Sequence, residues 1–274
     1  MSAQPARVAT EDAPLLLREA VGSIAVITFN RPATRNTLSE EVIAGLHAAL
    51  EEIGADKSIR ALVIAAKGPA FSSGHDLKQM TAHRSDPDGG RAYFAKTMTA
   101  CSAMMQAIVR LPKPVIAAVQ GIATAAGCQL VASCDLAVAS EDARFATSGI
   151  DNGLFCSTPM VPLSRNVASK HAMEMLLTGE MVSAEEAYRF GLVNRVVAPE
   201  ELEAETERLA ASIASRSGAT LKIGKEAFYR QREMALDDAY AYAAGVMVEN
   251  MLARDAEEGI GAFLDKRQPV WDGR

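Results

Sequence analysis

The sequence is short of cysteine, histidine and aromatic residues, and each shortage narrows the possible functions. Its four cysteines form no Cys-x-x-Cys pair and lie among small and apolar residues, which favours reduced, buried thiols. Its four histidines are scattered, so we expect no metal site. No apolar run approaches the roughly 18 residues that a membrane span requires, so we expect no membrane insertion. The dinucleotide fingerprint G-x-G-x-x-G and the hydrolase motif G-x-S-x-G are also missing.

An excess of positive charge is missing too. Lysine and arginine number 28 and aspartate and glutamate 34, so the net charge is −6. Proteins that bind nucleic acids concentrate positive charge, and we therefore expect no nucleic-acid partner.

The chain starts with a polar segment, Met1–Thr10, followed by two acidic residues, which is unlike a secretion or transit signal. On that basis the sequence predicts a cytoplasmic location.

What remains is an α/β pattern in two parts. Short apolar stretches alternate with helical periodicity up to residue 199, and beyond it helices alone are predicted. We therefore expect a core at 1–199 that contains the site and a helical tail at 200–274 that covers the site or contacts a partner subunit. Residues 148–162 are predicted to be a loop. The predicted strands are 15–20, 24–29, 60–66, 113–119, 136–139, 144–147 and 192–197, and the predicted helices begin near 39, 91, 125, 168, 183, 200, 221, 237 and 256.

Two strand-to-helix corners are the candidate functional stretches. One is Lys67–Met80, a turn with glycines that runs into a short helix, and the other is Val119–Asp135, a buried strand, a glycine turn and a helix of small residues. Small side chains let a ligand approach the backbone, and a helix N-terminus favours negative charge. The structural alternative for each is a tightly packed corner with no ligand.

The two corners carry motifs that resemble a known family. AFSSGHDL at Ala70–Leu77 and VQGIATAAGCQL at Val119–Leu130 are similar to the signature stretches of the crotonase (enoyl-CoA hydratase/isomerase) superfamily. Within it, Phe71–Leu77 and Gly153–Pro159 resemble one particular branch. Further matches extend the resemblance to nearly the whole chain: Asn30–Pro32, Leu177–Glu180, Ala184–Ala187, Gly191–Val193 and Phe263–Arg267.

The resemblance implies a fold, a ligand and an assembly. The fold is the crotonase (ClpP-like) spiral of ββα units with a C-terminal helical oligomerisation region, in trimers or dimers of trimers. The ligand is an acyl-CoA or enoyl-CoA thioester, with no cofactor besides the coenzyme A of the substrate. Two backbone N–H groups would polarise the thioester carbonyl, and by position they are those of Ser73 and Ala126. One such donor can be worth about 10²- to 10³-fold in rate.

The proton-transfer groups depart from the family pattern. Its hydratases use two glutamates, whose positions match Gln129 and Gly149 here. Each acid or base typically contributes about 10²- to 10⁴-fold, so efficient hydration is doubtful. Asp151 is the first substitute base, and His75 is another candidate. Asp76 and Asp135 are expected to be structural, and Cys156 is a weak candidate nucleophile because no histidine is near it in the sequence.

Substrate contacts are predicted around the same corners. The residues are Arg35, Gly74, His75, Asp76, Gly127, Gln129, Gly149 and, at the end of the last helix, Lys266.

Three functions stay open. The first is an enoyl-CoA hydratase or isomerase of fatty-acid metabolism, the second is an acyl-CoA-binding carrier or regulator, and the third is another CoA-thioester reaction at the same donors.

Overall fold

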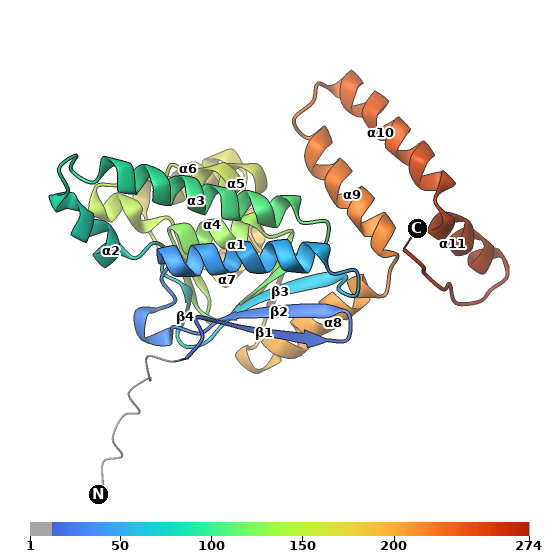
Figure 1. Cartoon of the computed structure of the whole chain (residues 1–274), viewed down its shortest axis with the longest axis horizontal. Helices are drawn as coiled ribbons and strands as arrows, with labels where there is room; N and C mark the ends of the chain where they lie inside the picture. The colour runs from blue at the N-terminus through green and yellow to red at the C-terminus, as the bar shows by residue number, and fades with distance from the viewer. Residues whose placement is uncertain (1–12, 274) are drawn as a thin grey trace, which may run out of the picture.

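The computed structural model describes residues 13–273 (Figure 1), so the polar N-terminal segment lies outside the described residues. Its strands form two sheets. The larger sheet has the order β1-β2-β3-β5-β7-β10 and the smaller one β4-β6-β8-β9. The strand bounds are β1 Leu16–Val21, β2 Ile24–Phe29, β3 Ala61–Ala66, β4 Ala70–Ser72, β5 Val115–Val119, β6 Ile122–Thr124, β7 Leu136–Ser140, β8 Arg144–Ala146, β9 Val182–Ser183 and β10 Arg195–Val197.

The chain winds as a spiral in which each turn supplies one strand to each sheet. β3 and β4, β5 and β6, and β7 and β8 are consecutive pairs, and their neighbours in each sheet run parallel. Only the first hairpin, β1 with β2, and the pair β8 with β9 are antiparallel. Parallel neighbours need long crossovers, which the helices provide. The predicted ββα spiral is therefore confirmed.

The helices cover the sheets and end in an extended tail. Ser39 caps the first helix as predicted, since its side chain accepts the N–H of Val42. The helix bounds are α1 Glu40–Ala55, α2 Leu77–Ala82, α3 Arg91–Arg110, α4 Ala126–Ser133, α5 Met160–Asn166, α6 Ser169–Thr178, α7 Ala184–Phe190, α8 Leu202–Ala214, α9 Gly218–Gln231, α10 Leu236–Leu252 and α11 Arg254–Leu264. None of these helices is long and apolar enough to cross a bilayer.

The helix α8 belongs to the core by its packing. Leu202, Leu209 and Ala210 are buried against Val63 and Val138 of the larger sheet. The predicted boundary at residue 199 therefore separates this helix from the sheet that it covers. Figure 1 shows that, of the described helices, only α9, α10 and α11 extend away from the sheets. Packing therefore places the boundary between core and tail between α8 and α9.

The tail helix α10 has no buried residue within the chain. Its large apolar side chains are exposed, among them Tyr240 (72%) and Leu252 (77%). The tail is nevertheless fixed at its base, because the buried carboxylate of Asp255 accepts the hydroxyl of Ser217 and the N–H of Gly273. These contacts join α11, the start of α9 and the C-terminal segment.

One segment predicted as loop contains a helix. Residues 148–152 form a 3-10 turn, and α5 begins at Met160, inside the predicted loop. Pro162 lies in the first turn of α5, where its missing N–H has no intrahelical partner to lose. Pro162 is therefore compatible with the helix start.

Candidate active site

The first corner, between β4 and α2, is fixed by hydrogen bonds to the segment before α1. The side chain of Asn36 is buried and donates to the carbonyl oxygens of Lys67, at 2.9 Å, and Ala70, at 2.8 Å. The N–H of Ser73 donates to the carbonyl of Arg35 at 3.0 Å. The backbone N–H of Ser73 is therefore engaged within the protein, which contradicts its predicted role as a free donor. Sequence reasoning missed Asn36, because its contacts are more than 30 residues away.

The two corners meet at Gly74. This glycine has φ +87°, and a Cβ atom added to it would lie 3.2 Å from the backbone nitrogen of Ala126. The neighbouring backbone groups are paired, since the Gly74 carbonyl accepts the N–H of Leu38 at 2.8 Å. Within residues 13–273, the N–H groups of His75 and Ala126 have no acceptor. A bare glycine thus brings two unused donors to the same place.

The second corner is strained at a residue that is not glycine. Ala125 has φ 49° and ψ −118°, a conformation that L-residues rarely adopt. It directly precedes α4, so this backbone turn sets the direction of the Ala126 N–H. Gly127 permits the close approach of α4 to the first corner, because a Cβ there would lie 2.1 Å from the carbonyl oxygen of Ser72. Both corners therefore exclude side chains where they touch.

His75 and Asp76 continue the first corner. Asp76 caps α2 by accepting the N–H groups of Lys78, at 3.0 Å, and Gln79, at 3.2 Å, which confirms its predicted structural role. Burial lowers the pKa of His75, so its imidazole is neutral at pH 7. Its Nε2 atom is buried without a hydrogen-bond partner in the described part of the chain.

The two positions predicted to match the family glutamates differ in what surrounds them. Gln129, on α4, is 4% exposed, and its Oε1 atom has no partner among the described residues. Gly149 has no room for a side chain, because a Cβ would lie 2.6 Å from the Leu154 carbonyl oxygen and 2.8 Å from Cys156 Sγ. Position 129 is thus open to a ligand, whereas position 149 is closed by the following loop.

The predicted substitute base lies against another element. Asp151 is exposed, and both carboxylate oxygens lie 3.3 Å from a Cβ atom added to Gly179, at the end of α6. Its carboxylate therefore lies at the protein surface beside α6, and its role as a base stays a prediction. Cys156 is a poor nucleophile, because burial raises the pKa of its thiol.

Asp135 is structural, as predicted, and it anchors the tail. Its carboxylate accepts the ammonium of Lys225 at 2.6 Å, the hydroxyl of Tyr229 at 2.9 Å and the N–H of Val115 at 2.7 Å. Lys225 also donates to two backbone carbonyls of the core at 2.9 Å. This buried group joins α9 to the end of α4 and the start of β5.

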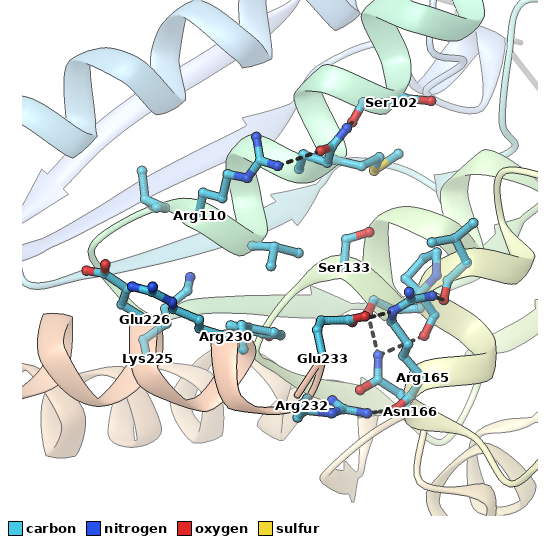
Figure 2. A pocket seen from close by; sticks show the side chains of 18 of the residues that line it. Ser102, Arg110, Ser133, Arg165, Asn166, Lys225, Glu226, Arg230, Arg232 and Glu233 are labelled. Atoms are coloured by element: carbon cyan, nitrogen blue, oxygen red, sulfur yellow. Dashed lines mark hydrogen bonds and ion pairs between the residues drawn. The ribbon is translucent and has the colours of Figure 1, made fainter. Parts of the chain in front are cut away.

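A cavity of about 980 Å³ lies between α3, α4, α5 and α9 (Figure 2). Gln129 and Ser133 contribute to its wall from α4.

Lys266 lies at the end of α11, and Figure 1 shows that helix well separated from the two corners. Arg35 is exposed beside the first corner. Of the predicted contacts, Gly74, His75 and Asp76 belong to the first corner. Arg35 and Gly127 contact this corner, and Gln129 follows Ala126 on α4. No group of three or more His, Cys, Asp or Glu side chains suited to a metal occurs within residues 13–273.

A spiral of ββα turns with two backbone corners in contact defines a crotonase-fold protein. The sequence matches the enoyl-CoA hydratase/isomerase family over residues 19–274. The chain belongs to this family, as its two motifs predicted.

Individual relatives agree in sequence and in structure. The mitochondrial enoyl-CoA hydratase domain-containing protein 3 of Xenopus laevis is 46% identical over 94% of this chain and 86% of its own length. The crystal structure of human enoyl Coenzyme A hydratase domain-containing protein 3 is 46% identical with a TM-score of 0.89, over 94% of this chain and all of that one. An enoyl-CoA hydratase of Mycobacterium smegmatis is 53% identical with a TM-score of 0.90, over 94% and 99%. The branch suggested by Phe71–Leu77 and Gly153–Pro159 is confirmed.

These relatives correct the predicted location. The Xenopus, rat and human proteins are all named mitochondrial. The cytoplasmic location inferred from the N-terminal residues is contradicted by these names, and the residues behind it lie outside the described part of the chain. Short polar N-termini are weak evidence, because targeting segments vary widely in length and composition.

Proposed function

We propose that the chain binds the thioester group of an acyl-CoA at the meeting point of the two corners and acts as an enzyme of the enoyl-CoA hydratase/isomerase type in fatty-acid metabolism. The thioester oxygen accepts the N–H groups of His75 and Ala126. His75 replaces Ser73 in this role, because the Ser73 N–H already donates to Arg35. The observation that carries the proposal is the close approach of the two corners at Gly74, where an added Cβ would lie 3.2 Å from the Ala126 nitrogen. The N–H groups of His75 and Ala126 have no acceptor there within residues 13–273.

The chemistry follows from where charge develops. Donors fixed by the backbone stabilise a thioester oxygen as it becomes negative, whether in enolate formation or in attack at the carbonyl. The helix α4 adds to this effect, since the Ala126 N–H is at its N-terminal end. Coenzyme A enters as part of the substrate, so the proposal includes no separate cofactor.

Gln129 and Gly149 limit the reaction. A carboxamide holds a water molecule but does not remove its proton. The closed space at Gly149 favours the second candidate, an acyl-CoA-binding carrier or regulator without turnover, or a third, a CoA-thioester reaction that does not need two carboxylates. The exposed apolar side chains of α10 support the trimer or dimer of trimers that the family resemblance implies.

The test compares two glycines with positive φ. In Gly74→Ala the new Cβ meets the Ala125 Cβ at 3.0 Å and the Ala126 nitrogen at 3.2 Å, so the donors must move. Gly89→Ala is the matched control, because Gly89 has φ +68° and nothing within 4 Å of its Cβ position.

The readout is binding of crotonyl-CoA together with the shift of the thioester carbonyl band in the infrared spectrum. We expect a shift to lower frequency in the wild type and in Gly89→Ala, and a smaller shift or none in Gly74→Ala. Equal shifts in all three proteins would refute the assignment of the donors. Turnover of crotonyl-CoA distinguishes the enzyme from the carrier.

A further inference from the structure

The cavity beside α4 lies between α3, α4, α5 and the tail helix α9. Gln129, Ala132 and Ser133 line it. Ala126 precedes Gln129 by three residues and therefore lies on the same face of the helix. At 1.5 Å of rise per residue, the face from Ala126 to Ser133 spans about 10 Å. A chain that leaves the thioester carbonyl in this direction would run along the cavity.

The side chain of Gln129 indicates that the cavity receives a ligand. It is 4% exposed, lines the cavity and has an Oε1 atom without a donor within residues 13–273. Buried acceptors without a donor are rare in folded proteins, because the lost interaction with water is not replaced. A water molecule or a ligand group in the cavity would satisfy it.

The wall opposite α4 suits an acyl chain. Met105, Val109 and Leu111 come from α3 and its end, and Val161 and Pro162 come from α5. Each methylene group that such a wall removes from water improves binding about fourfold. A volume of about 980 Å³ is large for the four carbons of a short acyl group.

The charges around the cavity are mainly positive, although the chain as a whole carries −6. Lys225 and Arg165 are already paired with carboxylates, Lys225 with Asp135 and Arg165 with Glu233. The other lining cations, which have no carboxylate partner among the described residues, are Arg110, Lys222, Arg230 and Arg232, and the one lining carboxylate without a cation is Glu226.

Two of these cations, Arg110 and Arg230, lie on one side of the cavity, whereas Arg232 lies on the other side, beside Asn166 (Figure 2). Figure 2 shows Arg110, Glu226 and Arg230 on one side, close to Lys225, with Ser133 between this group and Arg165. Lys225 donates to the Ile108 carbonyl in the last turn of α3, where Arg110 also lies. Among residues 13–273, Arg110 donates only to the neutral side chain of Gln106, at 2.9 Å, and Arg230 lies over the ring of Tyr242.

Resting on the proposed thioester site, we propose that this cavity binds an acyl chain whose far end carries an acidic group. The substrate class is then the CoA monothioester of a dicarboxylic acid. Its thioester lies at Ala126, its methylene groups contact the apolar wall, and its free carboxylate binds Arg110 and Arg230. Arginine is suited to this contact because its planar guanidinium matches a carboxylate.

The experiment measures calorimetric binding of octanedioyl-CoA and octanoyl-CoA, which differ only at the far end. We expect the wild type to bind octanedioyl-CoA about tenfold more tightly. Arg110→Gln and Arg230→Gln should each reduce this preference and leave the affinity for octanoyl-CoA unchanged. Glu226→Gln should increase it, and Arg189→Gln, on the exposed side of α7, is the control that should not change it.

Two results would overturn the proposal. One is equal affinity of the wild type for the two thioesters, which is also the result if a second copy of the chain fills the cavity. The other is a preference that survives the double variant Arg110→Gln/Arg230→Gln. Acetyl-CoA separates this failure from failure of the proposed function, because absence of binding by every thioester, acetyl-CoA included, would refute the thioester site itself.

Discussion

Replacement of Lys225 by methionine tests whether one buried ion pair holds the tail on the core. The ammonium contacts Asp135 at 2.6 Å, and the two side chains are 7% and 15% exposed. Methionine is unbranched and only one atom shorter than lysine, and it leaves the Asp135 carboxylate buried without its cation. Removal of one partner of a buried pair costs about 3–5 kcal/mol in the free energy of unfolding. For a chain of this size, that lowers the melting temperature by about 10 °C.

The control is an ion pair of the same length at the surface. Arg18 and Glu52 are also 2.6 Å apart, but their side chains are 45% and 62% exposed. Glu52→Gln should cost less than about 1 kcal/mol, because water screens the interaction. Unfolding is followed by circular dichroism and by fluorescence of Trp271, the only tryptophan, whose indole N–H donates to the Ser215 carbonyl at 2.8 Å.

A double-mutant cycle decides whether the pair acts as a unit. Lys225→Met combined with Asp135→Asn should cost less than the sum of the single changes, by about 0.5–3 kcal/mol. The reasoning is refuted if Lys225→Met costs no more than Glu52→Gln, or if the two changes at the buried pair are additive.

Two further predictions concern the backbone corner and the C-terminal segment. Ala125→Gly should raise the free energy of unfolding, measured in urea titrations, by about 1 kcal/mol. Relief of about 1–3 kcal/mol of backbone strain exceeds the entropy cost of glycine, which is about 0.5–1 kcal/mol. A lower free energy of unfolding would contradict the strained conformation of Ala125. Hydrogen bonds, chiefly from the Arg267 guanidinium, lower the pKa of Glu258 from 4.5 to about 2. Because the folded-state pKa is the lower one, the stabilising contribution is present above pH 4.5 and is lost as the pH falls toward 2. Trp271 fluorescence should therefore change over that pH range in the wild type. In Glu258→Gln it should already differ from the wild type at pH 7. Identical acid titrations of the two proteins would contradict the stabilising contact of Glu258 with Arg267.

Local signals predicted most of the fold. The β1–β2 hairpin follows from two β-branched stretches around a glycine, and α1 follows from the Ser39 cap and apolar residues at helical spacing. The helix α5 was missed because its 7 residues are too few to show a helical period clearly. Such elements depend on residues close in sequence, which a single chain displays directly.

The site was predicted less completely because its decisive contacts are distant in sequence. The bond from Ser73 to Arg35 spans 38 residues and makes His75 the proposed donor instead. Asp151 lies two residues after Gly149, yet its carboxylate turns to Gly179 in another element. Spacing along the chain cannot reveal either arrangement. The contact of Lys225 with Asp135, 90 residues apart, is equally invisible in the sequence.

The closed space at Gly149 has a consequence for how this site can evolve. A glycine codon can become a glutamate codon through one base change, but the new side chain would meet the Leu154 carbonyl and the Cys156 thiol. Glutamate there requires the following loop to move first, so the single substitution is expected to be selected against. At position 129 the carboxamide and carboxylate have nearly the same shape, and glutamate needs no rearrangement. Descendants of this sequence would therefore acquire an acid at position 129 more readily than at position 149.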